Sequence, residues 1–139
     1  MDKKIYIYAN DTEMSKIIEK TLRGRLVKSG LRAYDQYDED TQLIMCIGGD
    51  GTLLRLVQEF DFPKTPIVGI NTGHLGFFQE VLPEKIDDFI FFYNQDKYSI
   101  QSLNGVTVSV KTGDGISNHI ALNDITIRGI LTHPVHLNI

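Results

Sequence analysis

Residues 43–54 of this chain read Leu43-Ile44-Met45-Cys46-Ile47-Gly48-Gly49-Asp50-Gly51-Thr52-Leu53-Leu54. The apolar run is short and unbroken, which is typical of a parallel strand buried on both faces. The glycines that follow allow a sharp turn, because glycine adopts positive φ at little cost. Thr52 predicts the N-cap of a helix that begins at Leu53. A strand that ends in a glycine turn at a helix N-terminus forms an anion site, since free N–H groups and the helix dipole point at one spot.

Asp50 distinguishes this loop from a plain phosphate cradle. Its carboxylate would repel a phosphate placed directly on it, so it fits better as a magnesium-facing group or as a base for a hydroxyl that attacks a phosphate. The loop therefore predicts a phosphoryl-transfer site. The alternative interpretation is a tight turn with an exposed aspartate, because glycine turns are common in α/β chains.

Composition narrows the class of protein. The 139 residues suffice for one domain with a real core, and the net charge of -4 makes nucleic acid an unexpected partner. No apolar run approaches the ~20 residues that span a bilayer, and no signal-peptide core follows Met1, so no membrane association is expected. Cys46 is the only cysteine and is predicted to be an inert, packed thiol. These features predict a cytoplasmic protein.

The elements before and after the glycine loop follow an α/β pattern. We expect a strand at 5–9, a helix from Thr12 ending near Gly30, a short strand near 31–34 and a solvated acidic loop at 35–40. The helix stripe is predicted to consist of Ile17, Ile18, Leu22 and Leu26. A helix at about 53–60 follows the glycine loop, and Pro83 begins another, with a core stripe of Ile86, Phe89, Ile90 and Tyr93.

A second glycine-containing loop follows the short buried strand Ile67-Val68-Gly69-Ile70. It reads Asn71-Thr72-Gly73-His74-Leu75-Gly76-Phe77. Open α/β sheets bind ligands at the carboxyl ends of their strands, so both loops are expected to face one crevice. His74 is a candidate phosphate contact there, and Arg55 is close enough along its helix to reach an anion. The alternatives are a structural or solvent-exposed histidine and an exposed helix arginine.

The pattern changes at about residue 100. Val106, Val108 and Val110 alternate with polar residues, a glycine turn lies at 112–115, and Ile125-Thr126-Ile127 alternates again, which predicts antiparallel hairpins. We therefore place a domain boundary there, with domains at 1–100 and 101–139. His133 and His136 are three apart, which in a strand places them on opposite faces, so we expect no shared metal.

Three motifs in this order resemble NAD kinases, particularly those of Gram-positive bacteria: Gly48-Gly49-Asp50-Gly51-Thr52, then 71–77, then Asn123-Asp124. The first motif is shared with lipid kinases and 6-phosphofructokinases. The second motif and the Asn-Asp pair are more specific. The resemblance implies a Rossmann-like α/β domain with a parallel sheet, followed by the opening strands of an all-β, antiparallel NAD-binding domain.

The resemblance also implies the reaction. A NAD kinase transfers a terminal phosphate from ATP, or from polyphosphate, to the 2′-hydroxyl of the adenosine ribose of NAD, with Mg²⁺ or another divalent metal. Asp50 matches the proposed proton acceptor, and Gly51 matches a substrate-contacting glycine. Gly48, Gly49 and Thr52 would hold phosphates. Asn123 and Asp124 match the pair that binds the adenosine half of NAD. The other expected nucleotide-binding residues are Arg55, Asn71, Gly73, His74 and Phe77.

The chain departs from the family pattern in two ways. The family pair is most often Asn-Glu, so the shorter Asp124 is expected to make a weaker or water-mediated contact. Family members also continue well past residue 139, so we expect a truncated chain that is inactive alone and a homo-oligomer for the intact protein. The alternative functions are a non-catalytic nucleotide-binding module and a kinase for a lipid or sugar-phosphate hydroxyl.

Overall fold

The structure is a computed structural model that describes residues 3–73, 76 and 78–122. It divides into two compact units, Met1–Ile100 and Gln101–Ile139, each of which is described by itself. Within the described residues, no helix combines the length and the apolar character needed to cross a membrane.

The first unit is built on a parallel sheet of four strands in the order β2-β1-β3-β4. The strands are β1 (Lys4–Ala9), β2 (Arg32–Tyr34), β3 (Leu43–Gly48) and β4 (Ile67–Asn71). All six residues of β3 are buried, which confirms the prediction of a strand covered on both faces. Ala9 pairs with Ile47 and Gly48 pairs with Asn71, so the carboxyl ends of β1, β3 and β4 meet at one edge.

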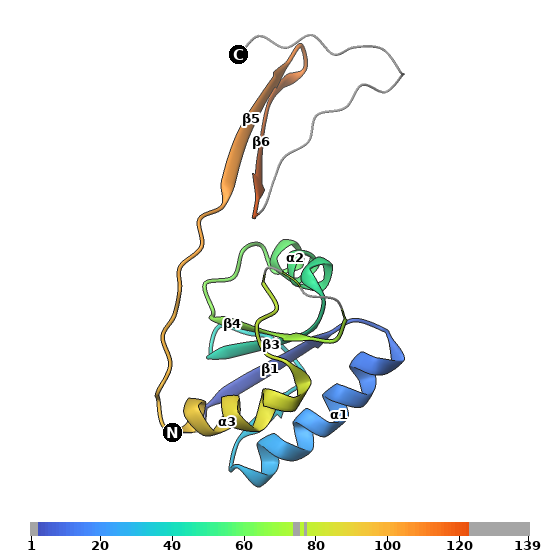
Figure 1. The fold of residues 1–139 in the computed structure, drawn as a ribbon. Helices are drawn as coiled ribbons and strands as arrows, with labels where there is room; N and C mark the ends of the chain where they lie inside the picture. The colour runs from blue at the N-terminus through green and yellow to red at the C-terminus, as the bar shows by residue number, and fades with distance from the viewer. Residues whose placement is uncertain (1–2, 74–75, 77, 123–139) are drawn as a thin grey trace. The chain divides into compact units, whose positions relative to one another are not determined.

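Helices cover both faces of this sheet, as Figure 1 shows. Helices α1 (Glu13–Lys28) and α3 (Ile86–Asn94) lie on one face, and α2 (Asp50–Glu59) lies on the other. A short 3-10 helix, η1 (Pro83–Lys85), leads into α3. The main core lies between the sheet, α1 and α3, and is formed by Ile5, Ile7, Ile18, Leu22, Leu26, Leu31, Leu43, Met45, Ile47, Ile70, Ile86, Ile90 and Tyr93.

Two expectations for the helices are wrong. Ile17 is 61% exposed, whereas Ile18, Leu22 and Leu26 are buried, because residues four apart share one helix face and Ile17 lies outside that row. Thr52 is not an N-cap. Helix α2 begins at Asp50 with Gly49 as its N-cap, and the amides of Thr52 and Leu53 already donate to the Gly49 carbonyl at 3.1 and 3.3 Å.

The other helix boundaries follow the expected signals. The Thr12 hydroxyl caps α1 by accepting a hydrogen bond from the Ser15 amide at 3.2 Å. Gly30 follows the end of α1 with φ +77°, a left-handed conformation that favours glycine. In α3, Ile86, Ile90 and Tyr93 are buried and Phe89 packs against them, which confirms the predicted stripe.

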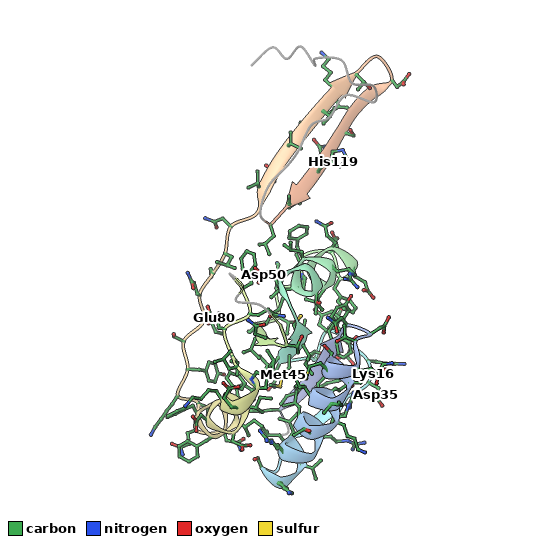
Figure 2. The ribbon with its side chains drawn as sticks, turned by 45° about the vertical axis from the view of Figure 1, so that its right-hand side comes forward. Lys16, Asp35, Met45, Asp50, Glu80 and His119 are labelled. Carbon is green, nitrogen blue, oxygen red and sulfur yellow. The ribbon has the colours of Figure 1, made fainter. Side chains whose placement is uncertain are left out.

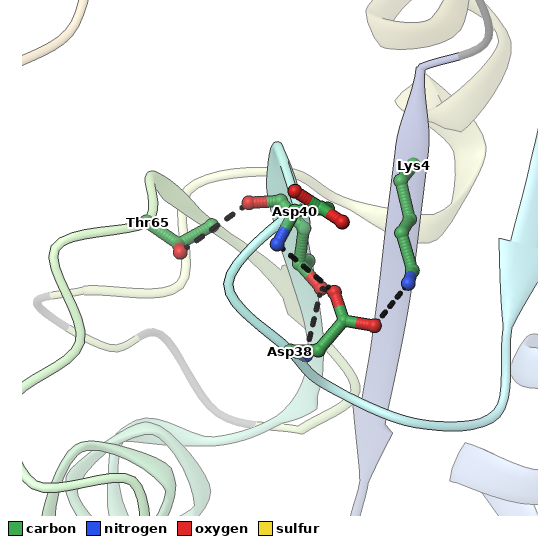
Figure 3. A network of polar contacts seen from close by, with 5 residues as sticks. Lys4, Asp38, Asp40 and Thr65 are labelled. Carbon is green, nitrogen blue, oxygen red and sulfur yellow. Dashed lines mark hydrogen bonds and ion pairs between the residues drawn. The ribbon is translucent and has the colours of Figure 1, made fainter.

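The acidic segment at 35–40 is mostly exposed, as expected, and Asp38 ties its end to β1 (Figure 3). The Asp38 carboxylate pairs with Lys4 and accepts hydrogen bonds from the Asp40 amide at 3.0 Å and the Thr41 hydroxyl at 3.3 Å. The hydrogen bond from Lys4 lowers the pKa of Asp38. Thr65 donates to the Thr41 carbonyl at 3.4 Å, which links this segment to the connection before β4.

The second unit contains an antiparallel hairpin of β5 (Val106–Thr112) and β6 (Gly115–Ala121), as predicted. Thr112 pairs with Gly115, so Gly113 and Asp114 form a two-residue turn, and Gly115 has φ +133°. The strand predicted at 125–127 and the histidines His133 and His136 lie outside the described residues.

Candidate functional site

The candidate site lies at the carboxyl ends of β1 and β3, where the order in which the chain adds strands to the sheet reverses. From β1 the chain crosses to β2 on one side, and it then returns to β3 on the other side. The loops after β1 and β3 therefore diverge, and parallel sheets bind ligands in the crevice that results. A cavity of about 520 Å³ opens there. Its described lining residues come from three segments that follow β1, β3 and β4: Asn10, Thr12 and Met14; Gly49 and Asp50; Thr72, Gly73 and Gly76.

Close contact with Thr52 explains why the glycine loop begins with Gly48. Gly48 has φ +153°, and a Cβ there would lie 2.3 Å from the Thr52 hydroxyl oxygen. Thr52 itself is 4% exposed, and its hydroxyl accepts a hydrogen bond from the Asn10 amide at 3.3 Å. Gly48 and Thr52 thus pack against each other, and only a residue without a side chain fits at the end of β3.

Asp50 is half-buried at the first position of α2, at the edge of the cavity (Figure 2). Its Oδ1 accepts a hydrogen bond from the Phe78 amide at 3.0 Å. Gly76 approaches so closely that a Cβ there would lie 2.5 Å from the same oxygen. The segment that leaves the second glycine loop therefore holds the carboxylate of the first loop. The carboxylate is therefore half-buried and held against a cavity, and it is not simply exposed on a turn.

A chain of polar side chains connects the three walls of the cavity. Asn10 Oδ1 accepts hydrogen bonds from the amide and the hydroxyl of Thr12 at 3.3 and 2.9 Å. The hydroxyl oxygens of Thr12 and Ser15 lie 3.0 Å apart, and the Ser15 hydroxyl donates to the Thr72 hydroxyl at 3.5 Å. Ser15 is fully buried. Together with the bond from Asn10 to Thr52, these contacts fix the spacing of the loops.

Cys46 lies beneath the site and is buried, as expected. Burial raises its pKa to about 11, although a hydrogen bond from Gln79 acts in the opposite direction. The thiolate is the reactive form of cysteine, so Cys46 is a packing residue and not a nucleophile.

The structure places the other sequence-predicted site residues differently. Gly49, Asp50 and Gly73 line the cavity. Asn71 is buried and its Oδ1 accepts a hydrogen bond from the Gly73 amide at 2.9 Å, so it shapes the second loop, while Gly51 is exposed in the first turn of α2. His74, Phe77, Asn123 and Asp124 lie outside the described residues.

Arg55 is exposed on α2 and is not among the residues described as lining the cavity. Its charge acts instead on Tyr8, whose hydroxyl donates to Glu59 at 2.7 Å. Burial and the bond to Glu59 raise the pKa of Tyr8 to about 12, and Arg55 opposes that rise. Arg55 is therefore close to the aromatic face between β1 and α2.

Sequence reasoning missed the first wall of the cavity, formed by Asn10, Thr12 and Met14, and the residues Thr72 and Gly76 of the third. The sequence pattern predicts only the end of a strand at residue 9 and the start of a helix at Thr12. The available signal was position: these residues follow the first strand of a parallel sheet, where a switch point can form.

The residues present fit a magnesium ion that is carried by a nucleotide. Mg²⁺ usually keeps several waters and binds through one or two carboxylates together with substrate phosphates. Asp50 supplies such a carboxylate among the described lining residues. Within residues 3–73, 76 and 78–122, no three His, Cys, Asp or Glu side chains are grouped to hold a metal by themselves.

Comparison with known proteins places the chain in a family. Residues 5–98 match the model of the ATP-NAD kinase N-terminal domain. A NAD kinase of Finegoldia magna is 35% identical over 99% of this chain and 51% of its own length. A NAD kinase of Limosilactobacillus reuteri is 34% identical over 91% and 47%. The chain thus spans about half the length of these curated relatives.

A solved structure with the same fold is that of yeast NADH kinase complexed with NADH. It has a TM-score of 0.70 and 16% sequence identity, and the match covers 86% of this chain and 43% of the yeast chain. The glycine loops, the parallel sheet and the match to the family model together lead to one conclusion: the chain belongs to the NAD kinase family and contains its N-terminal domain.

Proposed function

We propose that the protein containing this chain is a NAD kinase, a transferase that converts NAD to NADP with ATP or polyphosphate as phosphate donor. The observation that carries the proposal is the placement of Asp50 against the cavity at the switch point. Residues 1–100 would form the phosphate-handling domain, and residues from 101 would begin the NAD-binding β domain.

Asp50 would act as the proton acceptor. As the new bond forms between the ribose 2′-oxygen and the terminal phosphorus, the bond from that phosphorus to the bridging oxygen breaks, and the hydroxyl proton passes to the Asp50 carboxylate. The hydrogen bond from Phe78 holds one carboxylate oxygen, which fixes the orientation of the base. When bound, Mg²⁺ would neutralise charge that develops on the phosphate oxygens.

The remaining residues would bind the nucleotides. The N-terminus of α2 is suited to phosphate because its first N–H groups and its dipole point toward the loop. Gly48, Gly49, Gly51 and Thr52 would form this phosphate loop. Asn71, Gly73, His74 and Phe77 would form the facing loop, and Arg55 would supply a nearby charge. Asn123 and Asp124 would bind the adenosine half of NAD. We propose a cytoplasmic homo-oligomer for the intact protein, as the family resemblance implies.

The test is NADP formation from NAD, ATP and Mg²⁺, read by a coupled NADP-specific dehydrogenase. The assay is run on residues 1–139 and on the full-length natural protein. Activity in the full-length protein supports the proposal. Nucleotide binding without NADP would indicate a non-catalytic module, and turnover of a lipid or sugar phosphate in place of NAD would indicate another kinase.

The variant Asp50→Asn tests the proton acceptor. Asparagine has almost the same size but cannot accept the proton, so turnover should fall at least ~100-fold, the lower range for a general base, with nucleotide affinity within about threefold. The matched control is Asp61→Asn. Asp61 is exposed just beyond the opposite end of α2, and its φ of 51° suits asparagine. Unchanged turnover in Asp50→Asn would remove Asp50 from the mechanism.

A further inference from the structure

The return segment, which we define as residues 78–81, brings one buried polar side chain beneath the glycine loop. After the second loop the chain doubles back beside β4: the Val81 amide donates to the Gly69 carbonyl at 2.9 Å, and the Asn71 amide donates to the Val81 carbonyl at 2.8 Å. These bonds anchor the segment to the sheet. Gln79, within this segment, is 4% exposed.

The side-chain amide of Gln79 contacts one carbonyl within β3 and one in the turn that follows it. Its Nε2 donates to the Gly49 carbonyl at 3.2 Å and approaches the Cys46 carbonyl at 3.4 Å. Gly49 directly precedes Asp50. Because both neighbours are carbonyl acceptors, the nitrogen must face them, and an exchanged oxygen and nitrogen would place acceptor against acceptor.

The carbonyl oxygen of the same Gln79 side chain lies in an unfavourable environment. Gln79 Oε1 is buried and has no hydrogen-bond partner among the described residues. It occupies space that exists only because residue 69 is glycine, since a Cβ there would lie 1.6 Å from Oε1. Buried polar groups are nearly always paired, and an exception next to a reactive group calls for a functional reason.

We infer that Gln79 is a positioning residue for Asp50, and this inference rests on the proposed kinase function. The adjacent residue, Phe78, donates its amide to the Asp50 carboxylate at 3.0 Å. The dipeptide thus holds Asp50 twice: Gln79 holds the backbone just before it, and Phe78 holds its carboxylate. An apolar residue at 79 would remove the unpaired oxygen, and the Gly49 carbonyl would keep the Thr52 and Leu53 amides as donors but would lose its bond to the return segment. The Gln79 amide therefore serves the geometry of the loop more than its stability.

The test uses the full-length natural protein and the variant Gln79→Met, which keeps the side-chain length but removes the donor. Gln42→Met is the matched control, because Gln42 is exposed just before the opposite end of β3. Two quantities are measured: kcat and KM for NAD and ATP, and the hydrogen-exchange protection of the Phe78 amide by NMR. The second readout does not depend on turnover.

In Gln79→Met we expect kcat to fall at least tenfold while both KM values stay within twofold. The Phe78 amide should exchange at least tenfold faster, and the melting temperature should not fall. Values of kcat and Phe78 protection within twofold of wild type would overturn the inference. A joint loss of kcat, KM and melting temperature would also overturn it, because that pattern belongs to a purely structural residue.

A second variant covers the case in which Gln79→Met does not fold. In Gln79→Glu, the protonated acid still donates to the Gly49 carbonyl, whereas the ionised form cannot. Phe78 protection in this variant, relative to wild type, should therefore fall as pH rises through the titration of Glu at 79, and pH-independent protection would count against the inference. If wild type makes no NADP but Gln79→Met still loses Phe78 protection, the positioning role stands and the proposed kinase function fails.

Discussion

The substitution Gly76→Ala is predicted to displace the Asp50 carboxylate without disturbing the rest of the fold. A Cβ on residue 76 would lie 2.5 Å from Asp50 Oδ1 and 2.9 Å from its Cγ. Ordinary contact begins at 3.4 Å, so the carboxylate and residue 76 must separate by about 0.9 Å. The Phe78 amide, which now donates to Oδ1 at 3.0 Å, would lose this partner or move with it.

A displacement of this size is large for a general base. A misplacement of ~1 Å costs about 100-fold in rate, so we expect kcat to fall by that factor. The loss corresponds to ~2.7 kcal/mol on the activation barrier, since each tenfold change is worth 1.36 kcal/mol. Gly76 has a φ that alanine tolerates, so the melting temperature should change by only a few degrees.

The assay is coupled NADP formation with the full-length protein, with kcat and both KM values determined beside thermal unfolding. Gly24→Ala is the matched control, because Gly24 is exposed within α1 and an added Cβ would meet nothing within 4 Å. It should leave kcat unchanged and stabilise the protein by ~0.5–1 kcal/mol. A Gly76→Ala protein that folds normally and retains kcat within threefold of wild type would refute the placement of Asp50 as the base.

Three further predictions concern stability and reactivity. Leu22→Ala, at a fully buried position, should lower the free energy of unfolding by ~3 kcal/mol in denaturant titration, and a loss below ~1 kcal/mol would contradict the core assignment. Gly48→Ala should cost about 2–3 kcal/mol in the same measurement, from the φ of +153° and the overlap with Thr52. Cys46 should resist iodoacetamide in the folded protein near neutral pH. Because burial raises its pKa from 9.0 to about 11, its contribution to stability should be present below pH 9 and lost between pH 9 and 11; rapid alkylation of the folded protein would contradict this.

Local sequence patterns predicted the helices and strands well where the burial of a residue follows from its position within its own helix or strand. The apolar run at 43–47 forms a strand buried on both faces, and the stripe Ile86, Ile90 and Tyr93 packs into the core. The helix start at Thr52 was predicted wrongly, because an N-cap threonine and a buried threonine in the first turn have the same sequence signature. Only the hydrogen bonds to the Gly49 carbonyl distinguish the two.

The candidate site was predicted in part. The sequence indicated that Asp50 and the second glycine loop face one crevice, because both follow buried strands. It did not indicate that Asn10 and Thr12 form a third wall, since that depends on β3 pairing with β1 on the side away from β2. It also gave no sign of Gln79, whose role depends on a return segment pairing with β4.

By itself, then, the sequence indicated the class of sheet, most strands and helices, and Asp50 as a candidate functional carboxylate. The elements follow from hydrophobic periodicity and from glycine positions, which act over a few neighbouring residues, whereas the family was indicated by the resemblance of the motifs. The tertiary structure alone decided which loops meet, which atoms hold Asp50 and why residues 69 and 76 must be glycine. Those features arise from strand order and from contacts between residues far apart in the chain, which no local pattern specifies.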